Sequence, residues 1–193
     1  PRITLTETER PLQSLLNLIK GTKTVSLRQS TDDTALTGYS ALADELLAIP
    51  GLSDVFIASS SGTTAQALLE RFKELKMPIT VHIVQTTEVS PLVHALNKTQ
   101  GPEPVSVTEK SLADAIVDRV AHRREALENI SHEQNGKGWI ASNQTITAAQ
   151  NILCTKADIE TTSNGSLSLA GLLTAQSHNT TFTGTVACII TGK

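Results

Sequence analysis

The sequence predicts an α/β protein of three layers, with a mostly parallel sheet and helices on both of its faces. The first observation is a strand pattern at residues 54–58, followed by a helical pattern at 63–76 and a second strand pattern at 79–84. Short strand–helix–strand connections of this kind are typical of a parallel crossover unit. The second observation is the run at 186–190, which is apolar throughout. Because it lacks polar positions that could face water, we expect this strand to be covered on both faces.

Apolar spacing along the rest of the chain predicts the remaining elements. Helical patterns cover residues 12–19, 41–47, 91–96, 111–130, 144–154 and 165–176, and a brief strand is expected at 139–141. In the pattern at 111–130, charged residues occupy the face opposite the apolar one: Asp118, Arg119, Arg123, Arg124, Glu125 and Glu128. Residues 1–50 are expected to form part of a smaller domain with a connecting helix, and residues 51–193 the main α/β domain.

Composition and charge exclude several classes of protein. The chain has 193 residues, of which 39% are hydrophobic, so it can bury a sizeable core. Its net charge of −3 and the lack of a continuous basic cluster argue against nucleic acid as a partner. No apolar run has the length of a membrane span, and the first residues show no secretory pattern. We therefore expect a soluble, cytoplasmic protein with no membrane partner.

The cysteines and histidines do not show the spacing of metal ligands, so no metal site is predicted. We expect Cys154 and Cys188 to be small buried hydrophobic residues. His82 lies inside an apolar strand pattern, and we expect a core histidine whose ring nitrogens have hydrogen-bond partners.

Small polar residues join the first predicted strand to its helix, in the stretch SSSGTT at 59–64. The first backbone N–H groups of a helix have no partner within the helix, so such a turn can bind an anion, and its hydroxyls could surround a phosphate. It has neither the Gly-Lys-Ser/Thr of a P-loop nor the GxGxxG of a dinucleotide turn. The alternative is that the hydroxyls only cap the helix.

A second hydroxyl, that of Thr191, follows the strand expected at 186–190. The carboxyl ends of parallel strands meet at one edge of a sheet, so we expect Thr191 to share an edge and a common hollow with residues 60–64. The alternative for Thr191 is an ordinary turn at the end of a strand.

Six segments, taken in order, resemble one enzyme family. They are LTGYSALADEL at 36–46, DVFIASSSGTTAQALLERFKEL at 54–75, VHIVQ at 81–85 with the following SPL at 90–92, WIASNQTITAAQNILC at 139–154, TSNGSLSLAGL at 162–172 and VACIITGK at 186–193. This order resembles the C-terminal half to two-thirds of the fold-type II pyridoxal-phosphate-dependent enzymes, which include threonine synthase, threonine dehydratase and cysteine synthase.

The resemblance implies a cofactor, pyridoxal phosphate, and the residues that bind it. The family's turn binds the phosphate of the cofactor, which corresponds here to Ser60, Ser61, Gly62, Thr63 and Thr64. The family's hydroxyl after the last strand contacts the pyridine nitrogen, which corresponds to Thr191. A neutral hydroxyl leaves that nitrogen largely unprotonated, which suits elimination and replacement reactions on an amino-acid substrate. Family members are commonly dimers, so a homodimer is an expectation as well.

Within the family, the Thr191-Gly192 ending is closest to threonine synthase, because dehydratases more often have Ser-Gly there. The complete enzyme would then convert O-phosphohomoserine and water to threonine and phosphate. Two features depart from the family pattern. Ser60 and Thr63 stand where the family turn usually has glycine. The family's Schiff-base lysine lies in an N-terminal portion, before the matched segments, and no lysine here has a comparable setting.

These departures leave three interpretations. The first is the C-terminal part of a threonine-synthase-like lyase that needs a missing N-terminal portion, so that this chain alone has no catalytic residue and is inactive. The second is a non-catalytic ligand-binding or regulatory domain of the same fold. The third is a relative of threonine dehydratase or cysteine synthase.

Overall fold

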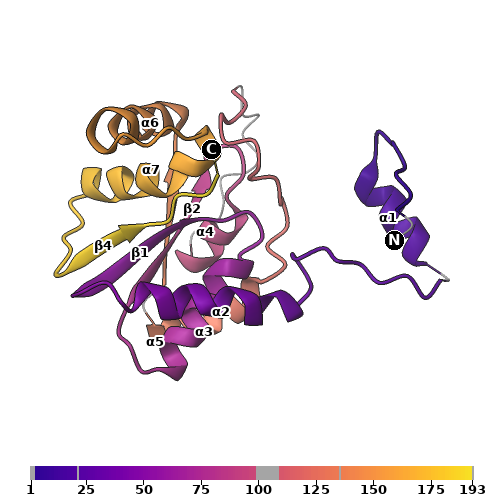
Figure 1. Ribbon diagram of the computed structural model, residues 1–193, viewed down its shortest axis with the longest axis horizontal. Coiled ribbons are helices and arrows are strands. Elements are labelled where there is room, and N and C mark those ends of the chain that lie inside the picture. Colours follow the sequence, from indigo (N-terminus) through magenta and orange to yellow (C-terminus); the bar gives the residue numbers. More distant parts are fainter. Residues whose placement is uncertain (1–2, 21, 99–108, 135, 193) are drawn as a thin grey trace.

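The chain forms a parallel four-stranded sheet in the computed structural model, which describes residues 3–20, 22–98, 109–134 and 136–192 (Figure 1). The strands are β1 (Leu52–Ala58), β2 (Thr80–Thr86), β3 (Lys137–Ala141) and β4 (Thr185–Cys188). Their order is β3-β2-β1-β4, and every neighbouring pair is parallel. The predicted α/β class is confirmed.

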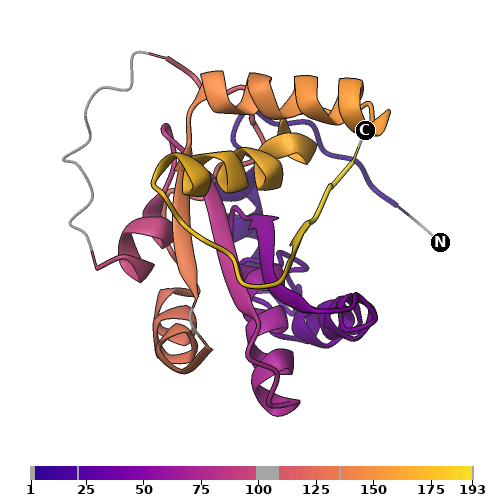
Figure 2. The same ribbon diagram turned by 90° about the vertical axis from the view of Figure 1, so that its left-hand side faces the viewer.

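Helices cover both faces of the sheet, which gives the three expected layers. The helices are α1 (Pro11–Ile19), α2 (Thr34–Leu46), α3 (Thr63–Glu74), α4 (Pro91–Leu96), α5 (Arg124–Gln134), α6 (Asn143–Ala157) and α7 (Ser163–Ser177). In Figure 2, α7 lies on one face with α6 stacked outside it, and α2, α3 and α5 lie on the other side. Helix α1 has no buried residue and stands apart from the sheet in Figure 1. None of the helices in the described ranges is both long and apolar enough for a bilayer crossing.

The two central strands are buried on both faces because successive side chains point to opposite sides of a sheet. Val55 and Ile57 of β1 join the core beneath α2 and α3, together with Val81 and Ile83 of β2. Phe56 packs in the second core, beneath α6 and α7. A proline-free apolar pattern of this kind is typical of central parallel strands.

His82 is the core histidine that the sequence predicts. It is fully buried on β2, where its Nε2 lies 2.7 Å from Asp54 Oδ1 and its Nδ1 accepts a hydrogen bond of 2.8 Å from Trp139 Nε1. Because the indole N–H can only donate, Nδ1 carries no proton, and Nε2–H donates to the carboxylate. Phe56 stacks on the imidazole at 4.1 Å between ring centroids. The prediction is confirmed.

The helix expected over 111–130 is wrong in its first half. Helix α5 begins only at Arg124, and residues 109–123 are irregular except for short turns. Side chains of other elements take the backbone N–H groups of this segment: Asn143 accepts from Leu112, and Asn164 accepts from Ala115. These tertiary bonds replace the i→i−4 bonds that the apolar spacing suggested. We refer to residues 109–123 as the 109–123 segment.

Two further expectations about burial are wrong. Strand β4 is half-buried at best, because it lies at the edge of the sheet and pairs only with β1. Cys154 is exposed, since it lies on α6, the outer helix of its side, whereas Cys188 is half-buried. The proposed division of the chain near residue 50 remains a prediction.

Candidate functional site

The turn between β1 and α3 opens the helix with a glycine in the left-handed conformation. Gly62 is the N-cap of α3 with φ of 90° and has no side chain to cap the helix, while Ser61 Oγ accepts a long bond of 3.4 Å from the N–H of Thr63. A Cβ at this position would lie 2.7 Å from Leu127 Cδ1 and 3.1 Å from Leu92 Cδ1. The backbone conformation therefore requires glycine, and a Cβ would also force the leucine methyl groups beneath the turn to shift.

Three hydroxyls of the stretch 59–64 form hydrogen bonds within the protein. Thr63 Oγ1 donates to the backbone oxygen of Gln29 at 3.0 Å, so the hydroxyl of Ser61 is the donor in its 2.9 Å bond with Thr63. Ser59 Oγ accepts from the N–H of Gly62 at 3.0 Å. Ser61 and Thr63 thus shape the turn and have no hydroxyl proton left for a ligand.

Ser60 differs from these neighbours because its hydroxyl proton is not used within the protein. Its Oγ accepts from the backbone N–H groups of Val117 and Asp118, each at 3.0 Å. Both lone pairs are occupied, and the hydroxyl proton remains for a further acceptor. Ser60 therefore ties the 109–123 segment to the turn while keeping one donor.

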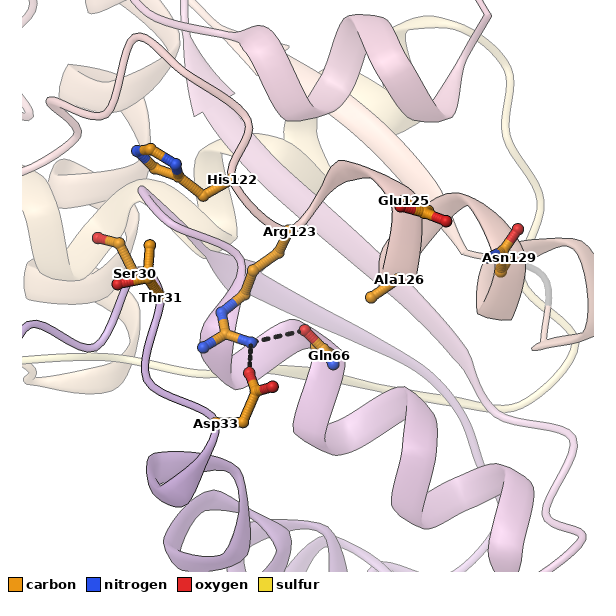
Figure 3. Close-up of a pocket in the computed structure, with 9 residues that line it drawn as sticks. All are labelled: Ser30, Thr31, Asp33, Gln66, His122, Arg123, Glu125, Ala126 and Asn129. Atoms are coloured by element: carbon orange, nitrogen blue, oxygen red, sulfur yellow. Dashed lines mark hydrogen bonds and ion pairs between the residues drawn. The ribbon is translucent and has the colours of Figure 1, made fainter.

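Arg123, at the end of that segment, is buried, with only 5% of its side chain exposed. Figure 3 shows its guanidinium between the side chains of Asp33 and Gln66. Each of its five N–H donors has an acceptor 2.7–3.0 Å away: Thr63 Oγ1, Asp33 Oδ1, Gln66 Oε1 and the backbone oxygens of Gln29 and Asp32. The helical pattern at 111–130 places Arg123 on the polar face, whereas the structure buries its side chain. A planar guanidinium suits this position because its fork can bind several fixed acceptors at once.

A second ion pair fixes residues 28–33 to the 109–123 segment. Asp118 accepts from Arg28 at 2.6 Å and from the hydroxyl of Ser30 at 3.1 Å, and its side chain is only 10% exposed. Residues 28–33, which we call the 28–33 segment, are therefore held at Asp118 and at Arg123. Periodicity could not reveal these two residues, because both contacts join parts of the chain about 90 positions apart.

An open pocket of about 470 Å³ lies beside this network. Figure 3 shows the residues that line it: Ser30, Thr31, Asp33, Gln66, His122, Arg123, Glu125, Ala126 and Asn129. The lining includes neither residues 60–64 nor Thr191, so this pocket is not the common hollow that the sequence analysis expects.

Thr191 follows β4 and is exposed. Phe56 of β1 lies opposite Cys188 of β4, and the N–H of Ile189 continues the ladder with a 3.0 Å bond to the oxygen of Phe56. Parallel pairing in this register brings Thr191 and the turn after β1 to the same edge of the sheet. Among the described residues, no hydrogen bond joins Thr191 to the turn. The backbone of Thr191 instead approaches the start of α7, where a Cβ on Gly165 would lie 2.7 Å from its oxygen.

Every lysine in the described ranges is exposed, which fits the expectation of surface charges. These are Lys20, Lys23, Lys73, Lys76, Lys98, Lys110, Lys137 and Lys156, while Lys193 lies outside the described residues. Within the same ranges, no group of three histidine, cysteine or acidic side chains could hold a metal ion.

An all-parallel sheet between helical layers defines an α/β protein of the kind that holds ligands at the carboxyl edge of its strands. This chain belongs to the family of pyridoxal-phosphate dependent enzymes, whose model matches residues 4–192. No curated protein matches its sequence.

Solved structures of enzymes with this fold are similar to the chain. A threonine deaminase from T.th. matches 84% of this chain and 59% of its own, with a TM-score of 0.64 and 19% identity. Serine racemase from Dictyostelium discoideum matches 93% of this chain and 57% of its own, with a TM-score of 0.73 and 15% identity. Isoform 2 of threonine deaminase from Solanum lycopersicum matches 93% of this chain and 51% of its own, with a TM-score of 0.70 and 15% identity. The chain thus spans a little over half the length of these proteins, and identities this low show the fold alone.

The donors at the turn fit the phosphate of the family's cofactor. The N–H group of Thr64, a half-buried residue in the first turn of α3, has no partner within the helix, whereas the next residue, Ala65, is fully buried. The hydroxyl proton of Ser60 and the positive end of the helix dipole add to this donor. Arg123 adds a buried positive charge near these donors, because its Nε donates to the hydroxyl of Thr63, the first residue of α3.

Proposed function

We propose that this chain supplies the part of a pyridoxal-phosphate-dependent enzyme that binds the phosphate of the cofactor, at Ser60, Ser61, Gly62, Thr63 and Thr64. One observation carries the proposal: Gly62, a residue without a capping side chain, opens α3 in the left-handed conformation at the carboxyl edge of a parallel sheet. Such a helix N-terminus favours a dianionic phosphate.

The five residues have different roles in this proposal. Ser60 donates its hydroxyl proton, and Thr64 offers its N–H and its half-buried hydroxyl. Ser61 and Thr63 fix the shape of the turn through their mutual bond, and Gly62 allows the chain to reverse above Leu127. Thr191, at the same edge, is the proposed partner of the pyridine nitrogen.

The cofactor, when bound, supplies an electron sink for reactions at the α-carbon of an amino acid. A hydroxyl such as that of Thr191 is neutral at physiological pH, so it binds the ring nitrogen without protonating it. The proposed substrate is a small amino acid bearing a leaving group on its side chain. Because all described lysines are exposed, we assign the reaction to the complete enzyme and not to this chain alone.

Within this class we place a threonine-synthase-like reaction first, in which O-phosphohomoserine and water give threonine and phosphate. The support is the Thr191-Gly192 sequence after β4. Deamination of threonine or serine is the alternative, supported by the structural likeness to proteins named threonine deaminase. Product analysis of the complete enzyme with O-phosphohomoserine, threonine and serine separates the two, since release of 2-oxobutanoate or pyruvate without threonine formation contradicts the first.

A non-catalytic binding domain is a second candidate function, and a specific observation favours it. Ser60 and Thr63 carry side chains where a glycine-rich turn has none, so a phosphate can approach the backbone less closely, and the hydroxyls of Ser61 and Thr63 bond within the protein and do not compensate.

Calorimetric titration of this chain with pyridoxal phosphate, pyridoxal and inorganic phosphate tests the common core of both candidates. We expect pyridoxal phosphate to bind and pyridoxal, which lacks the phosphate, to bind at least about tenfold more weakly, because hydrogen bonds to a charged group contribute about 1.5–3 kcal/mol each. Equal affinity for the two compounds, or no binding of either, contradicts the assignment of the turn.

A further inference from the structure

We propose that Arg123 is a positioning residue for the phosphate of the cofactor, and that it acts through the hydroxyl of Thr63. This inference rests on the proposed function, since it concerns the same turn. It assigns a role in ligand binding to a residue outside the turn, 60 positions further along the chain.

The first step is the geometry at Thr63, whose side chain is 3% exposed. Thr63 Oγ1 donates to the oxygen of Gln29 and accepts from Arg123 Nε at 3.0 Å and from the hydroxyl of Ser61 at 2.9 Å. A hydroxyl with one proton and two lone pairs is thereby saturated and held in one rotamer. Because Thr63 is the first residue of α3, fixing it also fixes the N–H groups of the helix start.

The second step is the charge that Arg123 adds behind the turn. Its guanidinium is buried, and the one carboxylate that it contacts, Asp33, has a side chain that is 80% exposed. Water screens an exposed carboxylate more than a buried cation, so the field of the guanidinium at the turn is only partly cancelled. That field has the same sign as the N-terminal end of the helix dipole and favours an anion.

The third step explains why the position requires arginine. The guanidinium reaches Thr63, the side chain of Gln66 on α3 and the oxygens of the 28–33 segment at the same time. A lysine carries the same charge but offers a compact ammonium without the planar fork. At position 63, where the family turn usually has glycine, this chain has a threonine whose hydroxyl accepts a hydrogen bond from Arg123.

The alternative is that Arg123 only ties the 28–33 segment to α3 and α5. A purely structural role predicts that replacing Arg123 lowers the stability of the chain and weakens the binding of pyridoxal and of pyridoxal phosphate by the same factor. A positioning role predicts a loss of affinity specific to ligands that carry phosphate. The ratio of the dissociation constants for pyridoxal and pyridoxal phosphate separates the two roles.

The experiment measures this ratio by calorimetry for the wild-type chain and for Arg123→Met, Arg123→Lys, Thr63→Val and the double variant Arg123→Met/Thr63→Val. Arg124→Met is the matched control, because Arg124 is the exposed neighbour that pairs with Glu128. We expect Arg123→Met and Thr63→Val each to weaken binding of pyridoxal phosphate and of inorganic phosphate by about tenfold or more, with pyridoxal unchanged.

We expect Arg123→Lys to bind pyridoxal phosphate more weakly as well, since lysine keeps the positive charge but lacks the planar guanidinium. The double variant should lose no more than the weaker-binding single variant, because the two residues act as one unit. If Arg123→Met does not fold, Thr63→Val still decides the matter. Wild-type binding with an unchanged ratio in Arg123→Met and Thr63→Val overturns this inference and leaves the proposed function standing. Absence of any phosphate-dependent binding by the wild-type chain overturns both.

Discussion

Replacing Gly62 with alanine should destabilise the protein by about 2–5 kcal/mol. The left-handed conformation, with φ of 90° at Gly62, costs a residue with a Cβ about 1–2 kcal/mol. The new methyl group would also lie 2.7 Å from Leu127 Cδ1, and overpacking a core costs about 1–3 kcal/mol. The sum is a large share of the stability of a typical domain, which is about 5–15 kcal/mol.

Gly38 provides the matched control, because it lies inside α2, where an added methyl group would meet no atom within 4 Å. Alanine there should stabilise the protein by about 0.5–1 kcal/mol, since glycine is unfavourable within a helix. The assay is urea unfolding followed by circular dichroism, with the free energy of unfolding compared among the wild-type protein, Gly62→Ala and Gly38→Ala. Equal stability of Gly62→Ala and the wild type would refute the conformation assigned to the turn.

Three further predictions concern Ser60, His82 and the cysteines. Ser60→Ala should cost about 0.5–1.5 kcal/mol, because it removes the acceptor of two N–H groups that water can partly reach; hydrogen exchange should quicken at residues 117 and 118, and unchanged exchange contradicts the contact. Burial lowers the pKa of His82 below its ordinary value of 6.5, with Asp54 opposing the shift, so the unfolded chain binds the proton more readily. The free energy of unfolding should therefore have its full value above about pH 6.5 and decrease at lower pH. The variant His122→Gln, which removes an exposed histidine, should show the same decrease. An increase in stability on acidification contradicts a neutral His82. Burial raises the pKa of the Cys188 thiol to about 12, so a thiol reagent should modify the exposed Cys154 first and the half-buried Cys188 more slowly; equal rates for the two thiols contradict the packing of β4.

The sequence predicts the central part of the fold well because local signals and tertiary structure agree there. The strand at 54–58, the helix from residue 63 and the strand near 79–84 correspond to β1, α3 and β2. Alternating burial of Val55 and Phe56 on opposite faces follows from the strand period alone.

The prediction fails where contacts over long sequence distances decide the conformation. The 109–123 segment has apolar spacing that suits a helix, but Ser60, Asn143 and Asn164 bind its N–H groups from three other parts of the chain. For the same reason the role of Arg123 is invisible in the sequence, where it stands among other charges. Its acceptors lie in the 28–33 segment and at the start of α3, and only folding brings them together.

Hydrogen exchange of this chain with and without pyridoxal phosphate tests the central claim most directly, because it reports which N–H groups the ligand covers. We expect slower exchange at Thr64 on addition of pyridoxal phosphate, and no change on addition of pyridoxal. Protection confined to the pocket lined by Asp33, His122 and Glu125, or no protection at the start of α3, would contradict the account.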